Sequence, residues 1–129
     1  VGYALAHASV IQGLFKAVIP FGVTDVSQTA ALESLRHSDE VGIRAKEIAA
    51  VRDDFAEALR NQGWDVPEAQ GNFVWLPLGP LSSAFEDACV EQAVAVRNLG
   101  DGVRISIGEK EGLDRVLTVA SAFYAEHFG

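Results

Sequence analysis

The stretch Val103-Arg104-Ile105-Ser106-Ile107 alternates strictly between apolar and polar side chains. Successive side chains on a strand point to opposite faces of a sheet, so Arg104 and Ser106 share one face. The three β-branched side chains of the stretch take the other face. This alternation predicts a half-buried strand, and the sequence around it decides which neighbours that strand pairs with.

A hairpin is expected immediately before this strand. Residues 98–102 are rich in turn formers, and an apolar run ends at Arg97. A hairpin centred between residues 100 and 101 puts Arg97 opposite Arg104. Like charges in that position destabilise a strand pair by some tenths of a kcal/mol, and guanidinium forks match carboxylate and phosphate, which indicates a bound anion. The alternative is a solvated pair neutralised by acids such as Asp101 or Glu109, and surface ion pairs are the commoner case.

The second half of the chain predicts a small antiparallel sheet with helices on one face, an α+β fold. Apolar periodicity and turn residues place strands at 72–76 and 93–96, helices at 81–89 and 113–124, and a possible short strand at 64–66.

The first half predicts a short apolar strand over residues 1–6, followed by helices. Thr24 or Asp25 fits the N-cap of the second helix, Ser38 with Asp39 fits the cap before a long third helix, and Gly63 fits the position after its end. We place a domain boundary within that long helix, near Lys46. The expected domains are residues 1–45 and 46–129.

Composition excludes several classes of partner. The net charge of −8, with no cluster of Lys and Arg, argues against nucleic acid. No apolar stretch approaches the ~20 residues that a membrane helix needs. Cys89 is the only cysteine, which rules out an internal disulfide and fits a cytoplasmic protein. Acidic neighbours oppose a thiolate at Cys89, so we expect a small buried side chain there.

Several segments, taken in order along the chain, resemble the C-terminal part of the fold-type I, pyridoxal-phosphate-dependent aminotransferases. The chain is most similar to the histidinol-phosphate aminotransferase group and, within it, to the actinobacterial aromatic amino acid aminotransferases. The segments that carry the resemblance are Val1-Gly2-Tyr3-Ala4 with His7 and Val10, Gln70–Gly79 with its Trp-Leu-Pro-Leu-Gly ending, Val96-Arg97, and Gly102–Glu109.

The resemblance implies roles for particular residues. Arg104 would hold the substrate carboxylate, or the phosphate of histidinol phosphate, and Arg97 would assist it. Asn72 fits a turn-capping amide at least as well as a ligand. In the family, the cofactor lysine, a glycine-rich loop and a phosphate-binding arginine precede the Val-Gly-Tyr-Ala strand, so no catalytic, cofactor-binding or metal-binding residue is assigned within this chain. Residues 1–45 would then be the end of the large cofactor domain, and residues 46–129 the small domain.

The leading hypothesis is that the chain is part of a homodimeric enzyme of amino-acid biosynthesis. That enzyme would transfer an amino group between an aromatic amino acid and a 2-oxo acid, and the 129 residues alone would be inactive. Lys16, Lys46 and Lys110 stand in helical or acidic surroundings that do not suit a cofactor lysine. Histidinol phosphate is the alternative substrate. A stand-alone module that binds a small anion without chemistry is the alternative from another class.

Overall fold

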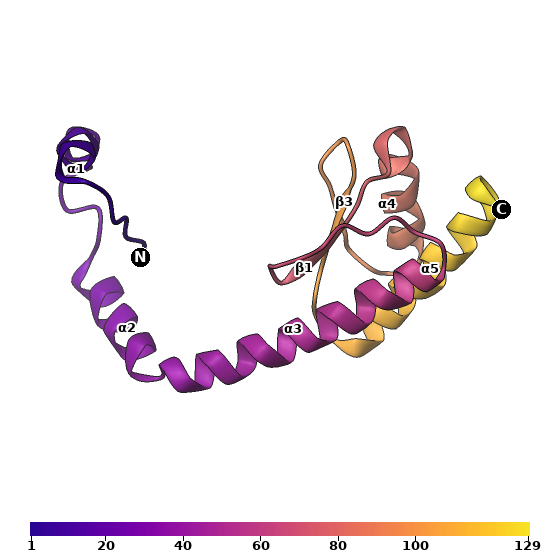
Figure 1. Ribbon diagram of the computed structural model, residues 1–129, viewed down its shortest axis with the longest axis horizontal. Coiled ribbons are helices and arrows are strands. Elements are labelled where there is room, and N and C mark those ends of the chain that lie inside the picture. The colour runs from indigo at the N-terminus through magenta and orange to yellow at the C-terminus, as the bar shows by residue number, and fades with distance from the viewer. The chain divides into compact units, whose positions relative to one another are not determined.

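The computed structural model describes all 129 residues and divides them into two compact units, Val1–Gly42 and Ile43–Gly129 (Figure 1). The first unit contains helices and irregular segments, and the second holds a three-stranded sheet with helices. The fold class is α+β, as the sequence predicted. No helix combines the length and apolar character that crossing a bilayer demands.

The first unit is built from α1 (Ala8–Phe15), α2 (Asp25–Arg36) and the start of α3 (Ser38–Asn61). Both short helices have side-chain N-caps. His7 Nδ1 accepts a hydrogen bond of 3.4 Å from the backbone of α1, and Thr24 Oγ1 accepts one of 3.2 Å from the backbone of α2. These bonds satisfy amides that the first turn of a helix leaves unpaired. They confirm Thr24 as the cap.

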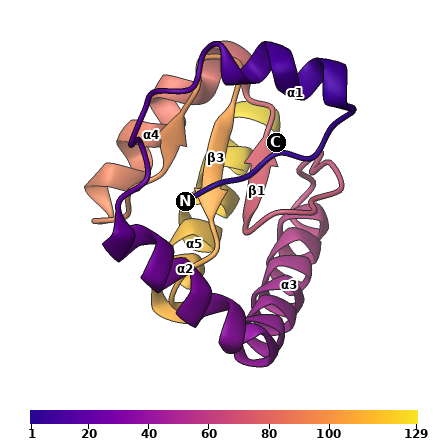
Figure 2. The ribbon, with the colours of Figure 1, turned by 90° about the vertical axis from the view of Figure 1, so that its left-hand side faces the viewer.

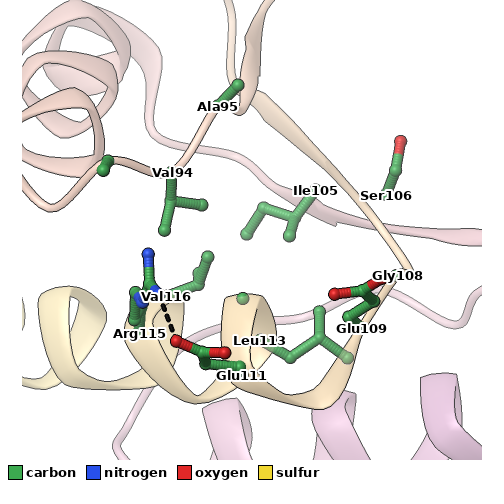
Figure 3. Close-up of a pocket in the computed structure, with 12 residues that line it drawn as sticks. Val94, Ala95, Ile105, Ser106, Gly108, Glu109, Glu111, Leu113, Arg115 and Val116 are labelled. Atoms are coloured by element: carbon green, nitrogen blue, oxygen red, sulfur yellow. Dashed lines mark hydrogen bonds and ion pairs between the residues drawn. The ribbon is translucent and has the colours of Figure 1, made fainter.

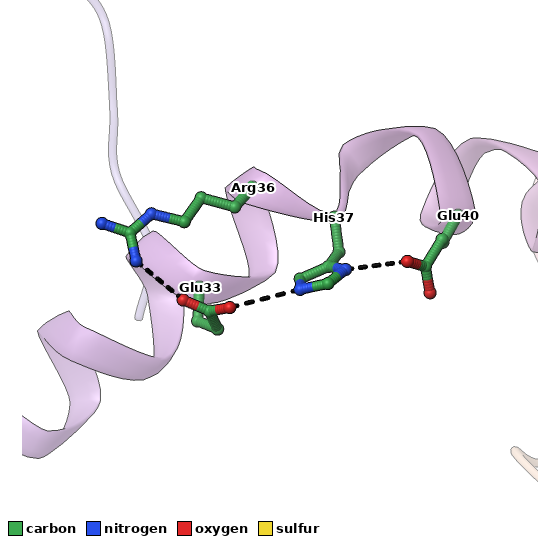
Figure 4. Close-up of polar contacts among 4 residues, drawn as sticks. All are labelled: Glu33, Arg36, His37 and Glu40. Atoms are coloured by element: carbon green, nitrogen blue, oxygen red, sulfur yellow. Dashed lines mark hydrogen bonds and ion pairs between the residues drawn. The ribbon is translucent and has the colours of Figure 1, made fainter.

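The corner between α2 and α3 is tied by charged side chains (Figure 4). The His37 ring lies between two carboxylates, 2.8 Å from Glu40 and 3.2 Å from Glu33, and Arg36 approaches Glu33 to 2.9 Å. Each of these side chains is more than half exposed. Exposed ion pairs stabilise by only about 0.2–1 kcal/mol, so these contacts add little to the free energy of folding.

The predicted strand over residues 1–6 is not formed. A strand needs a neighbouring backbone to bond with, and Val1–Gly42 contains no other strand. None of the side chains in this unit is buried. The apolar residues that suggested a strand, among them Tyr3 and Leu5, are exposed.

In the second unit the sheet has the order β1-β3-β2, and both pairings are antiparallel. Its strands are β1 (Phe73–Leu76), β2 (Arg97–Asn98) and β3 (Val103–Ser106). One face is apolar, and the side chains of Val74, Leu76, Val103 and Ile105 on it are almost completely buried.

Helices cover this apolar face. A 3-10 turn, η1 (Gly79–Leu81), leads into α4 (Ser82–Glu91), and α5 (Lys110–Phe128) closes the chain. Figure 2 shows α5 behind β1 and β3. The C-terminal half of α3 contributes Phe55, Ala56 and Leu59 to the same core.

Trp64 is the hub of an aromatic cluster within this core. Its ring centroid lies 5.1–6.5 Å from those of Phe85, Phe123, Tyr124 and Phe128. Edge-to-face and stacked contacts at these spacings add about 0.5–1.5 kcal/mol each beyond area burial. The cluster joins α4 and α5 to the turn after α3.

Two predicted strands of this unit were wrong. Residues 64–66 form no strand, although Trp64 and Val66 are buried in the core. Residues 93–96 form no strand, because Ala93 takes a positive φ of 55° in the turn after α4 and the Val94 amide donates to the Cys89 carbonyl at 3.0 Å. Only the following two residues pair as β2. The other predicted elements are present, and Gly63 ends the long helix with a φ of 104°.

Candidate functional site

The face of the sheet opposite the core carries Phe73, Trp75, Arg97, Arg104 and Ser106, and we call it the arginine face. Arg104 stands on the central strand. Arg97 of β2 lies directly opposite it on one side, and Trp75 of β1 on the other. This confirms the predicted register of the hairpin, with the two arginines as cross-strand partners.

The turn between β2 and β3 fixes that register. Gly100 has a φ of 92°, and its amide donates to Asn98 Oδ1 at 2.9 Å. The Leu99 amide donates to the Gly102 carbonyl at 3.0 Å. A side chain bonding the backbone two residues on is the usual way an asparagine stabilises a turn. The turn-capping amide is therefore Asn98, in an Asn-x-Gly pattern that the sequence displays.

The Asn72 side chain makes no hydrogen bond, so the predicted capping role is absent there. Its backbone carbonyl accepts from the Ile107 amide at 2.8 Å. That bond continues the pairing of β1 with β3 by one step.

Neither arginine of the pair forms an ion pair. All ion pairs of the chain involve other cations, and the predicted alternative, neutralisation by Asp101 or Glu109, is not found. Arg97 is exposed and Arg104 is half-buried. Two guanidinium groups side by side without a carboxylate repel each other, and a shared anion would relieve that repulsion.

Arg104 has an unusual environment. Its Nε is shut off from solvent and has no hydrogen-bond partner. Its Cζ lies 5.6 Å from the centre of the Phe73 ring, within the range of a cation–π contact. The inner edge of the group is thus buried, and its remaining donors are not engaged by any side chain of the protein.

A separate cavity of about 320 Å³ lies between the segment after α4, the end of β3 and the start of α5 (Figure 3). Its charged lining residues are Glu109, Glu111 and Arg115, and Arg115 pairs with Glu111. Neither Arg97 nor Arg104 lines it. With its one cation already paired, this cavity does not suit an anion.

The lysines of the chain do not fit a carbonyl- and phosphate-bearing cofactor. Lys46 is exposed on α3, and Lys16 is exposed at the C-cap of α1. Lys110 is exposed as well and pairs with Asp114 at 2.6 Å, in a groove that Asp54 also lines. Two carboxylates there would repel a phosphate. The chain's own residues can bind and orient an anion, and no covalent step is assigned to them.

Known proteins match this chain closely. The family described as aminotransferase class I and II matches residues 1–119. An aromatic amino acid aminotransferase of Streptomyces coelicolor is 46% identical over 127 residues, which cover 98% of this chain and 35% of that protein. A protein of the same name from Rhodococcus opacus is 44% identical, over 95% of this chain and 34% of its own length. The chain therefore spans about a third of these relatives.

A solved structure has the same fold. A crystal structure of a candidate aminotransferase from Burkholderia pseudomallei superimposes with a TM-score of 0.73, at 22% sequence identity. The match covers 89% of this chain and 37% of that one. At this identity the likeness speaks to the fold.

Proposed function

The chain belongs to the class I and II aminotransferase family, and from that premise we propose that it is part of an enzyme that moves an amino group between an aromatic amino acid and a 2-oxo acid. Pyridoxal phosphate, the cofactor implied by the family, would supply the electron sink for that reaction. The names of the two relatives support aromatic substrates.

The arginine pair carries this proposal. Arg104 and Arg97 face each other across the hairpin without an acidic partner. Arg104 binds the substrate carboxylate in a planar, two-point contact, and Arg97 reinforces it from the edge strand. Fixing the carboxylate orients the amino group at the other end of the same molecule, so these residues act by positioning the substrate.

The chain corresponds to about a third of its relatives' length. In this proposal the residues that hold the cofactor belong to the rest of the enzyme. We assign residues 1–45 to the end of the large cofactor domain and residues 46–129 to the small domain. The full-length enzyme is a homodimer of the cytoplasm in this proposal. The role of residues 46–129 is to present the arginine face to the substrate.

Arg104→Ala in the full-length protein tests the proposal. We expect kcat/KM for an aromatic amino acid to fall about 100-fold, near 2.7 kcal/mol, because a partly buried carboxylate loses its charged partner. Arg97→Ala should lower it about tenfold, since Arg97 is exposed. Arg104→Lys keeps the charge without the fork and should fall between wild type and Arg104→Ala. Steady-state kinetics with phenylalanine and tyrosine measure each value.

Arg115→Ala is the matched control, because Arg115 pairs with Glu111 on α5 and lies outside the arginine face. Unchanged kinetics in Arg104→Ala would contradict the proposal. If the wild-type enzyme prefers histidinol phosphate to aromatic amino acids, histidinol phosphate is the substrate. Anion binding without any amino transfer by the full-length protein would favour a binding module.

A further inference from the structure

We propose that Phe73 is a positioning residue, whose ring is the platform that holds the guanidinium of Arg104 in its binding orientation. This inference rests on the proposed role of Arg104. It concerns the orientation of the Arg104 guanidinium, which the charge of the residue and its position on β3 do not determine.

The register places Phe73 within reach of Arg104. Phe73 pairs with Ser106, and Arg104 pairs with Trp75. Phe73 is therefore the diagonal neighbour of Arg104 on the same face, a spacing that long and aromatic side chains bridge. The distance of 5.6 Å from Cζ to the ring centre matches such a contact.

Arg104 has no hydrogen bond or ion pair that would fix its guanidinium. It donates to no backbone or side-chain oxygen, and its Nε is buried without a partner. The arginines that serve the structure differ. Arg52 bonds Asp53 and the Gly71 carbonyl, and Arg60 bonds the Val66 carbonyl twice. The guanidinium of Arg104 is therefore oriented by its packing on the Phe73 ring.

The Phe73 ring packs against Gly71. A Cβ on Gly71 would lie 2.9 Å and 3.2 Å from two atoms of the ring, so the ring occupies the space that a side chain at 71 would need. The Gly71 carbonyl accepts a bond of 3.0 Å from Arg52, whose side chain is only 11% exposed. The segment before β1 is therefore anchored from α3.

Trp75 is the other aromatic side chain on this face, and it serves the turn. A Cβ on Gly102 would lie 2.4 Å from its Cζ2 atom, so its ring lies over the start of β3. The cation–π contact of Arg104 is with Phe73. In this geometry the Phe73 ring packs against the Arg104 guanidinium, and the Trp75 ring packs against Gly102 at the start of β3.

Phe73→Leu in the full-length enzyme is the primary test. We expect KM for phenylalanine to rise about fivefold to tenfold while kcat stays within about twofold, because the arginine is retained but less well oriented. The dissociation constant of 3-phenylpropionate, measured by titration calorimetry, should rise by the same factor. Phe73→Tyr keeps the ring and should restore both values. Phe128→Leu removes a ring that contacts Trp64, far along the chain from the arginine face, and is the matched control.

Two double variants separate positioning from general structure. In an Arg104→Ala background, Phe73→Leu should not weaken 3-phenylpropionate binding further, because the ring then has nothing to hold. Gly71→Ala displaces the ring without removing it, so it should weaken binding in the wild-type background and have no effect once Phe73 is Leu. Additive losses in either double variant would overturn the proposal.

The outcomes also distinguish this inference from the function it rests on. If Arg104→Ala leaves kinetics unchanged, the proposed function fails and the inference with it. If Arg104→Ala loses activity while Phe73→Leu and Gly71→Ala behave as wild type, only the platform is refuted. Should Phe73→Leu not fold by circular dichroism, Gly71→Ala decides the question, since Gly71 has no positive φ to strain.

Discussion

Arg104 combines a permanent charge, partial burial and the absence of a carboxylate partner. A buried hydrogen-bond donor without an acceptor costs about 1–3 kcal/mol, so such donors are rare in native proteins and often have a functional reason. Here Nε is such a donor, and a like charge stands on the neighbouring strand. A bound carboxylate would offset the repulsion of the two arginines, which is why we regard the pair as a binding device.

Cys89, unlike Arg104, is a titratable side chain that is buried in its neutral form. It is fully buried on α4 and packs into the core. Burial, and secondarily the Glu86 carboxylate, raises the pKa of the thiol from 9.0 to about 11. The side chain therefore stays neutral at physiological pH, as expected of a structural cysteine.

That raised pKa predicts a pH dependence of stability. Above pH 9 the unfolded chain loses the thiol proton while the folded chain keeps it until about pH 11. Stability present below pH 9 is thus lost progressively between pH 9 and 11, at up to about 1.4 kcal/mol per pH unit. Urea unfolding of wild type and Cys89→Ala should show this slope in their difference. A difference that does not vary with pH would contradict it.

At the scale of elements, the β2–β3 hairpin depends on close approach at Gly102. A Cβ there would meet the Leu76 carbonyl oxygen and the Trp75 ring, each at 2.4 Å. Both obstacles belong to β1, and one of them is backbone. The absence of a side chain at 102 is what lets the hairpin lie against β1.

Gly102→Ala should therefore destabilise the chain by about 1–3 kcal/mol, the usual effect of forcing extra volume into a packed site. Gly108→Ala is the matched control, because a Cβ at Gly108 has no neighbour within 4 Å. Urea unfolding curves of the two variants and wild type give the free energies. Equal stability of all three would mean that β1 can shift aside without penalty.

Elements with a strong local signal were predictable from sequence. The alternation in residues 103–107 and the turn residues before them were enough to predict β3 and its register with β2. Residues 64–66 and 93–96 have strand-like composition, but neither segment pairs as a strand. Trp64 and Val66 pack into the core, and Ala93 belongs to the turn after α4. Tertiary context decided both, as it often does for short apolar runs.

The candidate site was predictable only in part. Arg97 and Arg104 are seven positions apart, so a hairpin assumption was enough to bring them together. The contact of Phe73 with Arg104 depends on the register of β1 with β3, strands separated by some thirty residues in sequence. No local pattern fixes that register, and the role of Gly71 beneath the ring follows from it.

At the scale of the whole molecule, the core is confined to one unit. Every residue of the buried cluster lies between Phe55 and Phe123. None of residues 1–42 is buried, and several large apolar side chains there, including Phe15, Ile19 and Phe21, are exposed. Stability is consequently unequal along the chain, because burial supplies most of the free energy of folding.

Amide hydrogen exchange of the 129-residue chain should show this inequality. We expect slow exchange in β1, β3, α4, α5 and the second half of α3, with protection that approaches the global free energy of unfolding. Amides of α1 and α2 should exchange at least about a hundredfold faster, since no buried packing opposes their opening. Comparable protection in α1 and α5, followed by mass spectrometry, would refute this division.

The chain has two tryptophans, and the structure gives them different surroundings. Trp64 is enclosed by four other rings, whereas Trp75 is half-buried beside Arg104. The two indoles are therefore independent optical reporters. The emission of Trp64 should follow unfolding of the core, and that of Trp75 should respond to an anion bound at the arginine face. A Trp75→Phe variant should therefore report on folding by fluorescence, and a Trp64→Phe variant should report on ligand binding.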